Sequence, residues 1–295
     1  MSGMFMRSVR LGCVALIAAT LPFVVFTNTR GQEQEVVDNT DTFLSGQSVI
    51  PAFDGWHQHP DGSADMWFSY LNQNWKEQLD VPIGPDNTFE PFGPDAGQPT
   101  HFLPRLNRWQ FAIRVPKDWG SSKEVVWTLT SKGKTYRAYG SLKPDTFMDN
   151  YGMQREAGVE LPPPDNKAPV IRIVGDRQRT AKAGQPILLS AVTTDDGLPK
   201  VVEGRRDRVA FGLRMAWVVY RGAGQVAFDP PQFKTWEDPR GGSAWARRWF
   251  PPPVPPDNTW SVRVTFSEPG AYVVRAHATD GLWYSNEGVA FTVTP

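Results

Sequence analysis

Apolar and polar residues alternate with a period of two along most of the chain after residue 48. This alternation is typical of β-strands with one buried face, whereas an amphipathic helix needs a period near 3.6. Residues 64–71, ADMWFSYL, place Met66, Phe68 and Tyr70 on one side of a strand. No segment carries a sustained helical stripe. The pattern therefore predicts an all-β protein.

The first half predicts further strands over residues 108–116, RWQFAIRVP, and a hairpin over 124–142, EVVWTLTSKGKTYRAYGSL. The hairpin turns at Gly133. We therefore expect an N-terminal β-sandwich-like domain over residues 43–150. The residues expected on shared strand faces are Trp109, Phe111 and Ile113 in the first strand, Val125, Trp127 and Leu129 in the second, and Tyr136 and Ala138 in the third.

A polar segment with three consecutive prolines, NYGMQREAGVELPPPDNKAP, follows. Prolines stiffen an extended chain and remove backbone donors, so residues 151–169 are predicted to be a linker. Residues 170–295 then resume the alternation between Gly, Pro and Asp turns, which favours a second β-sandwich. In its strand 270–281, Tyr272, Val274, Ala276 and Ala278 are expected inward, with Arg275 and His277 outward. The other inward residues expected are Met215, Trp217, Val219, Val289, Phe291 and Val293.

The second half resembles the PKD and cadherin-like immunoglobulin-type modules of bacterial secreted proteins. The likeness lies in AGQPILLSAVTTDDGLP, MAWVVYRGAGQVAF, SEPGAYVVRAHATDG and the final VAFTVTP. It covers about residues 170–295 and implies a non-catalytic spacer or binding module. A Trp- and Pro-rich insertion at about 229–259 departs from that pattern. The first half, with DGSADMWFSYLNQN, VPIGPDNTFEPF and GQPTHFLPR, resembles an uncharacterised segment of exported bacterial proteins, which implies a location but no activity.

The N-terminus predicts export. Arg7 and Arg10 precede an apolar run from Leu11 to Phe26, which is the order of a secretory signal peptide. The run is shorter than the roughly 20 residues that span a bilayer. We expect residues 1–31 to be removed, leaving a flexible lead-in over 32–42. The alternative is that the segment stays as an uncleaved anchor.

Charge and cysteine content narrow the function further. Residues 1–31 hold three Arg and no acid, so the mature chain has 31 − 3 = 28 basic residues against 31 acids, a net charge of about −3. No basic field remains for nucleic acid. The single cysteine, Cys13, lies inside the apolar run, so no disulfide is expected in the mature chain. About 260 residues suffice for a hydrophobic core.

Two sets of side chains are weak candidates for metal. His57 and His59 are two apart, which places both on one face of a strand, and His101 with Asp61 could complete a zinc set. Hydrogen-bonded or solvated histidines are the more ordinary reading. Asp195, Asp196 and Asp280 lie in turns that could meet at one end of the second sandwich and bind calcium, although Asp-Gly turns form for local reasons. The expectation is that the protein has no cofactor.

Catalytic motifs are missing from the sequence. No GxSxG nucleophile motif and no HExxH motif occurs. Carboxylate pairs such as Asp61 with Asp65, or Glu237 with Asp238, could serve glycosidic chemistry, but any chain with 31 acids offers such pairs. We therefore expect no enzyme activity.

Aromatic residues suggest binding instead. The chain has 12 Trp, and Trp rings stack on sugars and anchor interfaces. Trp127 and Trp217 lie mid-strand and are expected in the cores. Trp236, Trp245, Trp249 and Trp260 lie in or beside the Pro-rich insertion and could contact a glycan or an envelope protein, or could cover a satellite core.

Residues 81–105, VPIGPDNTFEPFGPDAGQPTHFLPR, are rich in proline and also contain Phe89, Phe92 and Phe102. The prolines up to Phe102 are Pro82, Pro85, Pro91, Pro94 and Pro99. Prolines confine this stretch to extended and turn conformations. The phenylalanines predict an ordered excursion pinned onto the first sandwich, with room for a ligand groove beside it.

The sequence as a whole favours a non-catalytic exported protein with a structural, adhesive or accessory binding role in the periplasm, at the cell surface or outside the cell. The alternative is a secreted carbohydrate-active or metal-dependent hydrolase with its site on the N-terminal domain. Clustering of acids with His57, His59 or His101 in one pocket would favour that alternative. The sequence names neither the ligand nor the oligomeric state.

Overall fold

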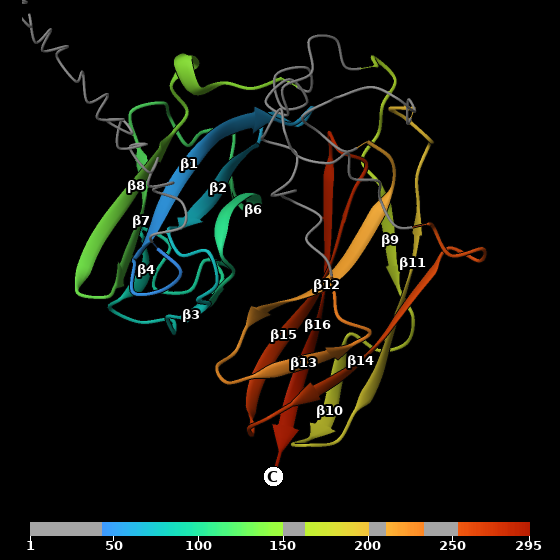
Figure 1. Ribbon diagram of the computed structural model, residues 1–295. Helices are drawn as coiled ribbons and strands as arrows, with labels where there is room; N and C mark the ends of the chain where they lie inside the picture. Colours follow the sequence, from blue (N-terminus) through green and yellow to red (C-terminus); the bar gives the residue numbers. More distant parts are fainter. Residues whose placement is uncertain (1–42, 150–162, 201–210, 233–252) are drawn as a thin grey trace, which may run out of the picture. The chain divides into compact units, whose positions relative to one another are not determined.

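The computed structural model describes residues 43–149, 163–200, 211–232 and 253–295. They belong to one compact unit, residues 40–295. Apart from one short 3₁₀ helix, η1 (Pro144–Thr146), every described element is a β-strand (Figure 1). The fold is therefore all-β. Within the described ranges, no helix has the length and apolar character needed to cross a membrane.

The described first half of the chain folds into three small antiparallel sheets. The larger two form the N-terminal sandwich, and the third is a two-stranded ladder beside it. The first sheet has β1 (Val49–Gln58), β2 (Ala64–Asn72) and β6 (Arg105–Val115) in that order, the second has β4 (Asn87–Glu90), β7 (Glu124–Ser131) and β8 (Lys134–Ser141), and the ladder pairs β3 (Leu79–Asp80) with β5 (His101–Phe102).

Aromatic rings fill the core of the N-terminal sandwich. Trp127 of β7 is fully buried, stacks on Phe89 at 5.6 Å between ring centroids and meets the edge of Phe111 at 5.1 Å. Phe68 of β2 and Phe102 of β5 are also fully buried against this group. Stacked and edge-to-face pairs of this kind each add about 1 kcal/mol beyond the area that they bury. The 81–105 stretch thus supplies two of the central rings, Phe89 and Phe102.

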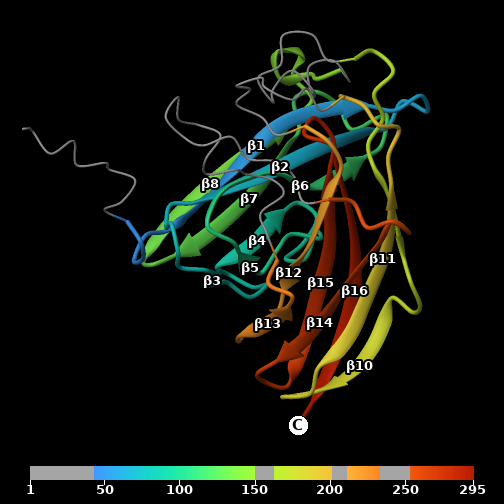
Figure 2. The same ribbon diagram turned by 45° about the vertical axis from the view of Figure 1, so that its right-hand side comes forward.

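The second half forms a sandwich of two four-stranded sheets (Figure 2). All its strand pairs are antiparallel except β10 with β16, which is parallel. One sheet has the order β13 (Val226–Asp229), β14 (Thr259–Phe266), β11 (Ile187–Thr194) and β9 (Val170–Ile173), and the other has β10 (Gln178–Lys182), β16 (Tyr284–Thr294), β15 (Gly270–Thr279) and β12 (Arg214–Arg221).

This strand order is that of an immunoglobulin-like sandwich. With the strands lettered in chain order from A, and β10 as a second A strand, the sheets read D-E-B-A and A-G-F-C. Trp217 on the C strand is 1% exposed, as the buried Trp of that fold is. Tyr272, near the start of the F strand, donates its hydroxyl to the Glu268 carbonyl four residues upstream at 3.0 Å. That bond is the tyrosine corner of immunoglobulin-like domains.

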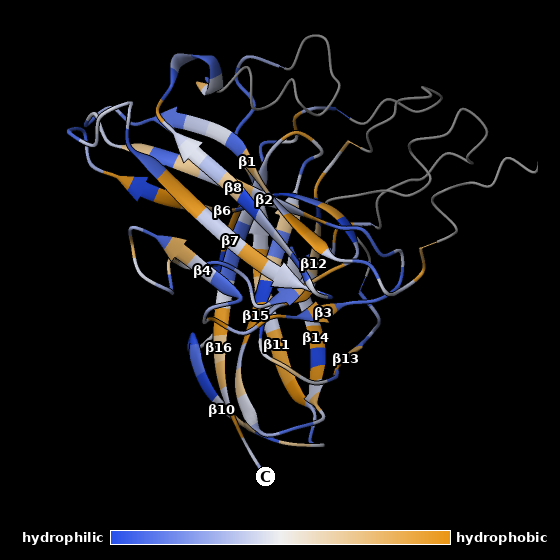
Figure 3. Cartoon of the chain, turned by 90° about the vertical axis from the view of Figure 1, so that its left-hand side faces the viewer, coloured by the Kyte–Doolittle hydropathy of each residue, from blue (hydrophilic) through white to orange (hydrophobic). Residues whose placement is uncertain are grey.

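The alternation read from the sequence is confirmed in both halves, and Figure 3 shows it along the strands. Met66, Phe68 and Tyr70 are buried together, and the 124–142 hairpin pairs Ser131 with Lys134 around Gly133. Phe92 differs from the expectation, because it is 40% exposed and stacks on Trp119 at the surface. The signal segment, the lead-in and residues 150–162 of the linker lie outside the described residues.

His277 corrects a second expectation. The alternation put it outward, and it does lie on the outer face of its sheet, but it is 1% exposed. It stacks on Tyr284 at 5.6 Å and its Nδ1 contacts Asn286 Oδ1 at 2.6 Å. Neighbouring Arg275 shows why that face is covered, because its guanidinium donates to the Gln110 carbonyl of the N-terminal sandwich at 2.7 Å. Burial lowers the pKa of His277 to about 4.

Candidate functional site

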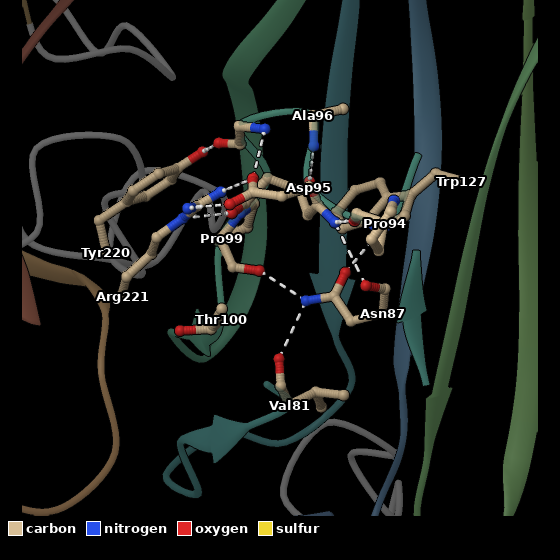
Figure 4. Close-up of polar contacts among 12 residues, drawn as sticks. Val81, Asn87, Pro94, Asp95, Ala96, Pro99, Thr100, Trp127, Tyr220 and Arg221 are labelled. Carbon is tan, nitrogen blue, oxygen red and sulfur yellow. Dashed lines mark hydrogen bonds and ion pairs between the residues drawn. The ribbon is translucent and has the colours of Figure 1, made fainter. Parts of the chain in front are cut away.

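Residues 95–103 join the two sandwiches, and we call this segment and its partners the seam. Residues 91–94 connect β4 to this segment, which contains β5. Asn87, which is fully buried, holds it in place, since its side-chain amide donates to the Val81 and Pro99 carbonyls at 2.9 and 2.8 Å (Figure 4). Its Oδ1 accepts the Trp127 indole N–H at 3.0 Å. One buried amide therefore ties the seam to the central ring of the N-terminal core.

Gln98 fixes the shape of the preceding turn. Its side-chain N–H₂ donates to the Asn87 carbonyl at 3.2 Å and to the Pro94 carbonyl at 2.6 Å, while its Oε1 accepts the Ala96 N–H at 2.8 Å. Gln98 is fully buried. Buried polar side chains that bond to backbone in this way make a turn rigid without a regular strand.

Arg221, the last residue of β12, meets this turn from the second sandwich. Its two terminal nitrogens donate to Asp95 at 3.0 and 2.8 Å, and its Nε donates to the Gln98 carbonyl at 2.8 Å. A bidentate guanidinium–carboxylate pair is geometrically specific as well as charged. The hydrogen bonds from Arg221 lower the pKa of Asp95, so the carboxylate stays ionised at neutral pH.

Tyr220 forms the buried side of the seam. Its hydroxyl donates to the Gly97 carbonyl at 2.6 Å, and its carbonyl accepts the Thr100 N–H at 3.2 Å. The guanidinium of Arg275 lies 3.2 Å from the centre of its ring. Burial raises the pKa of Tyr220, so it remains a neutral donor. The seam therefore combines an ion pair at its edge with a desolvated aromatic contact at its centre.

Two grooves flank the seam. The first has a volume of about 500 Å³ and a floor of small paired residues, Ala271 with Thr292 and Val273 with Ala290. The second has a volume of about 570 Å³, and we call it the β12 groove because Trp217–Val219 of β12 line one side. Thr100 lines the first groove and His101 lines the second. Volumes of this size suit a small ligand or a few residues of peptide.

His101 lies in the wall of the β12 groove and is 6% exposed. Its Nδ1 contacts Asp80 Oδ1 at 2.7 Å, and its Nε2 contacts Gln78 Oε1 at 2.7 Å. Glu77 lines the same groove, and its carboxylate binds Lys132 at 2.7 Å. This groove is thus where the structure gathers acids with one of the candidate histidines.

The other two candidate histidines lie at a separate place, the β1–β2 hairpin. The rings of His57 and His59 are 5.5 Å apart, His57 Nδ1 contacts the Met148 carbonyl at 3.3 Å, and His59 Nε2 contacts Asp65 at 2.8 Å. Asp61, also proposed for this set, accepts the hydroxyl of Ser63 instead. Within the described ranges, no three His, Cys, Asp or Glu side chains are arranged to hold a metal ion.

The three calcium candidates lie near one end of the second sandwich. Asp280 is fully buried and accepts the Leu282 and Trp283 N–H groups and the Asn166 amide. Asp195 is close enough to Asp280 to contribute to raising its pKa, although burial is the larger cause, and that pKa is about 6. Asp196 accepts the Lys167 N–H at 2.9 Å. These carboxylates bind backbone, as turn residues do, and calcium binding stays a prediction.

The insertion tryptophans are placed only in part. Trp260 is half-buried and packs against the core of the second sandwich. Its carbonyl accepts the indole N–H of Trp217 at 3.4 Å. Trp236, Trp245 and Trp249 lie outside the described residues.

Sequence reasoning missed the seam residues. Asp95, Tyr220 and Arg221 belong to no sequence motif, and Asp95 and Arg221 lie 126 positions apart, so no local pattern predicts their pairing. The available signal was the density of Pro, Asp and Gln around buried Phe residues, which indicated an ordered segment but not its partner.

No model of a known protein family matches the chain. No curated protein matches it. Solved structures with a partial likeness include immunoglobulin domains 1–4 of Sidekick-1, at 9% identity over 85% of this chain and 51% of that one, with a TM-score of 0.24. The D00-D0 domain of intimin is 10% identical over 83% of this chain and 100% of that one, with a TM-score of 0.24. Domains 4 and 5 of the S-layer protein SbsC are 10% identical over 84% of this chain and 98% of that one, with a TM-score of 0.23. This chain thus spans about half of the Sidekick-1 structure. TM-scores this low carry no argument about its function.

Proposed function

We propose that the chain is a non-catalytic exported protein with a structural, adhesive or accessory binding role in the bacterial envelope or the extracellular space. The observation that supports this proposal is the seam. Its polar groups, from Asp95 to Thr100 on one side and Tyr220 and Arg221 on the other, bond to one another across the two sandwiches. These contacts connect the two sandwiches directly.

A fixed pair of sandwiches suits attachment. A surface that is already rigid loses little conformational entropy when a partner binds, so more of the contact energy appears as affinity. The grooves beside the seam offer concave surfaces on such a rigid body. The partner classes are an envelope protein or a glycan, and the signal-like N-terminus supports the location.

The proposal is tested by expressing the full chain in a bacterium and fractionating the cells. We expect the exported protein to begin near Gln32 and to sediment with envelope fragments when purified 32–295 is mixed with them. Retention of Met1–Arg30, together with partition into membranes, would contradict export by cleavage. Cleaved protein that stays in the supernatant at every envelope concentration would contradict attachment.

One observation favours a second candidate, a secreted hydrolase. His101, Asp80 and Glu77 line one groove, which is the clustering of acids with histidine that such an enzyme needs. Elemental analysis of the purified chain separates the metal-dependent form of this candidate from the binding role. We expect no stoichiometric zinc. One zinc per chain that is lost in His101→Gln, together with hydrolysis of a glycan or peptide substrate, would favour the hydrolase candidate instead.

A further inference from the structure

On the edge of β12 that faces away from β15, backbone groups form hydrogen bonds like those that a neighbouring strand would form. Trp217 donates its backbone N–H to the side-chain Oε1 of Gln232 at 2.9 Å, and the Tyr220 carbonyl accepts the Thr100 N–H at 3.2 Å. β12 is the last strand of its sheet, and within the described residues no strand pairs with this edge. This edge is therefore bonded to one side chain, that of Gln232, and to one backbone group, the N–H of Thr100.

The spacing of these bonds is that of a β-ladder. In an antiparallel strand, alternate residues direct their N–H and C=O groups to the same edge. Trp217 directs its N–H outward, so Val219, two residues later, shares that edge. The irregularity between Val219 and Arg221 then brings the Tyr220 carbonyl to the same side. Thr100 thus supplies the first rung of a ladder that an added strand can continue.

The β12 groove runs along this part of the strand. Leu103 and Pro104 from the N-terminal sandwich line it, as do Val226 and Phe228 from β13. The side chains of an added strand would point alternately to its two faces. One face could then contact Leu103 and Pro104, and the other could contact Val226 and Phe228. Sheet edges that are flanked in this way bind extended peptides by main-chain hydrogen bonds.

The charges of the groove favour an uncharged occupant. Its two carboxylates already have partners, since Asp80 contacts His101 and Glu77 binds Lys132, each at 2.7 Å. Lys76 is exposed to solvent at the rim. A charged peptide side chain would lose hydration here and find these carboxylates occupied.

We propose that the β12 groove binds an extended, uncharged segment of a partner protein, which adds as a strand to β12 in continuation of Thr100. The proposal rests on the proposed binding role in that it names a partner class for it. The peptide titration uses purified protein and tests only the groove. A negative result there would leave the result of the envelope sedimentation experiment unchanged.

The probe is the capped peptide Thr-Val-Thr-Val-Thr-Val-Thr, titrated into purified 32–295. Two versions carry N-methyl groups on every Val or on every Thr, which removes the donors from one edge of the strand or from the other. We expect the parent to bind, one methylated version to lose at least about tenfold in affinity, and the other to stay within about threefold. Hydrogen exchange at the Val219 amide should slow on binding.

Gln232→Ala supplies the matched variant, with Gln225→Ala as the control in the same groove. Removing the Gln232 amide frees the Trp217 N–H, so the parent peptide should bind about threefold to tenfold more tightly, while the control stays within about twofold. Equal binding of both methylated peptides, or no binding of any peptide to either protein, would overturn the proposal. Self-association that protects Val219 without peptide binding would assign the edge to a second copy and would also overturn it.

Discussion

Arg221 binds both carboxylate oxygens of Asp95, at 3.0 and 2.8 Å, although the two residues lie 126 positions apart in the chain. The pair joins a Pro-rich turn of one sandwich to the end of an edge strand of the other. Asp95 is about half exposed, so the ion pair alone contributes little. Its value lies in its geometry, because the same guanidinium also bonds the Gln98 carbonyl and thereby positions Tyr220 beside Gly97.

Arg221→Ala should lower the free energy of unfolding by about 2 kcal/mol. The change leaves Asp95 with only the Gly97 N–H as a donor and removes the side-chain donor of the Gln98 carbonyl. Lost hydrogen bonds to a charged group cost roughly 1.5–3 kcal/mol. Urea unfolding at low and high salt measures the effect. Arg172→Ala, at an exposed β9 position, is the control and should change stability by less than about 0.5 kcal/mol. Equal losses of stability in the two variants would contradict the role of Arg221 in joining the sandwiches.

Asn87→Ala should be more damaging, at roughly 3–5 kcal/mol. It leaves the Trp127 indole N–H and the Val81 and Pro99 carbonyls unpaired in a buried place. Thermal unfolding followed by near-ultraviolet circular dichroism reports on Trp127 directly. Asp86→Ala, at the exposed neighbouring position, controls for the turn and should be nearly neutral. A mild Asn87→Ala variant with an unchanged Trp127 signal would contradict the role of this amide.

Two buried groups in the second sandwich should give opposite pH dependences. The folded-state pKa of Asp280 is raised to about 6 from 3.8, so the fold binds a proton that the unfolded chain does not, and its contribution to stability falls as pH rises from about 4 to 6. The folded-state pKa of His277 is lowered to about 4 from 6.5, so its contribution falls as pH drops from about 6.5 to 4. Each change amounts to roughly 3 kcal/mol.

These opposite slopes largely cancel in the natural sequence. Urea midpoints between pH 4 and 7 should therefore rise steeply with pH in Asp280→Asn and fall with pH in His277→Asn. Parallel curves for both variants and the natural sequence would show that neither group is desolvated to this degree.

The linker should be cut without separating the sandwiches. We expect limited proteolysis within residues 151–162, upstream of Asn166 and Lys167, which bond to the second sandwich. The two fragments should elute together in native buffer, because the seam still joins them, and apart in urea. In Arg221→Ala the fragments should separate at lower urea. Fragments that part spontaneously after the cut would mean that the linker alone holds the sandwiches together.

Local patterns predicted the strands because alternation is a local property. The hairpin at Gly133, the strand of Met66, Phe68 and Tyr70, and the burial of Trp127 and Trp217 all follow from residues within a few positions. The covered outer face was not predictable in this way. His277 reads as outward in its strand, and only the contact of Arg275 with Gln110, 165 residues away, shows that the face is covered.

The candidate site was less predictable than the fold. Histidine spacing placed His57 beside His59 correctly, but gave no reason why His101 should contact Asp80 and Gln78 instead. The seam and the covered face of β15 depend on backbone carbonyls, those of Gly97 and Gln98 in the seam and that of Gln110 beside Arg275, and carbonyls carry no sequence signature. Pairings between distant segments of this kind need the three-dimensional fold.

A distance between the two sandwiches tests the central claim most directly, which is that the seam makes them one rigid body. The mature chain expected from signal removal has no cysteine, so Tyr139→Cys and Leu188→Cys, both at exposed positions, accept one spin label each. Pulsed electron–electron double resonance on the doubly labelled protein should give a single narrow distribution of distances between the two spin labels. This distribution should broaden when Arg221→Ala and Tyr220→Phe are added. A distribution that is already broad with the seam intact would contradict the account.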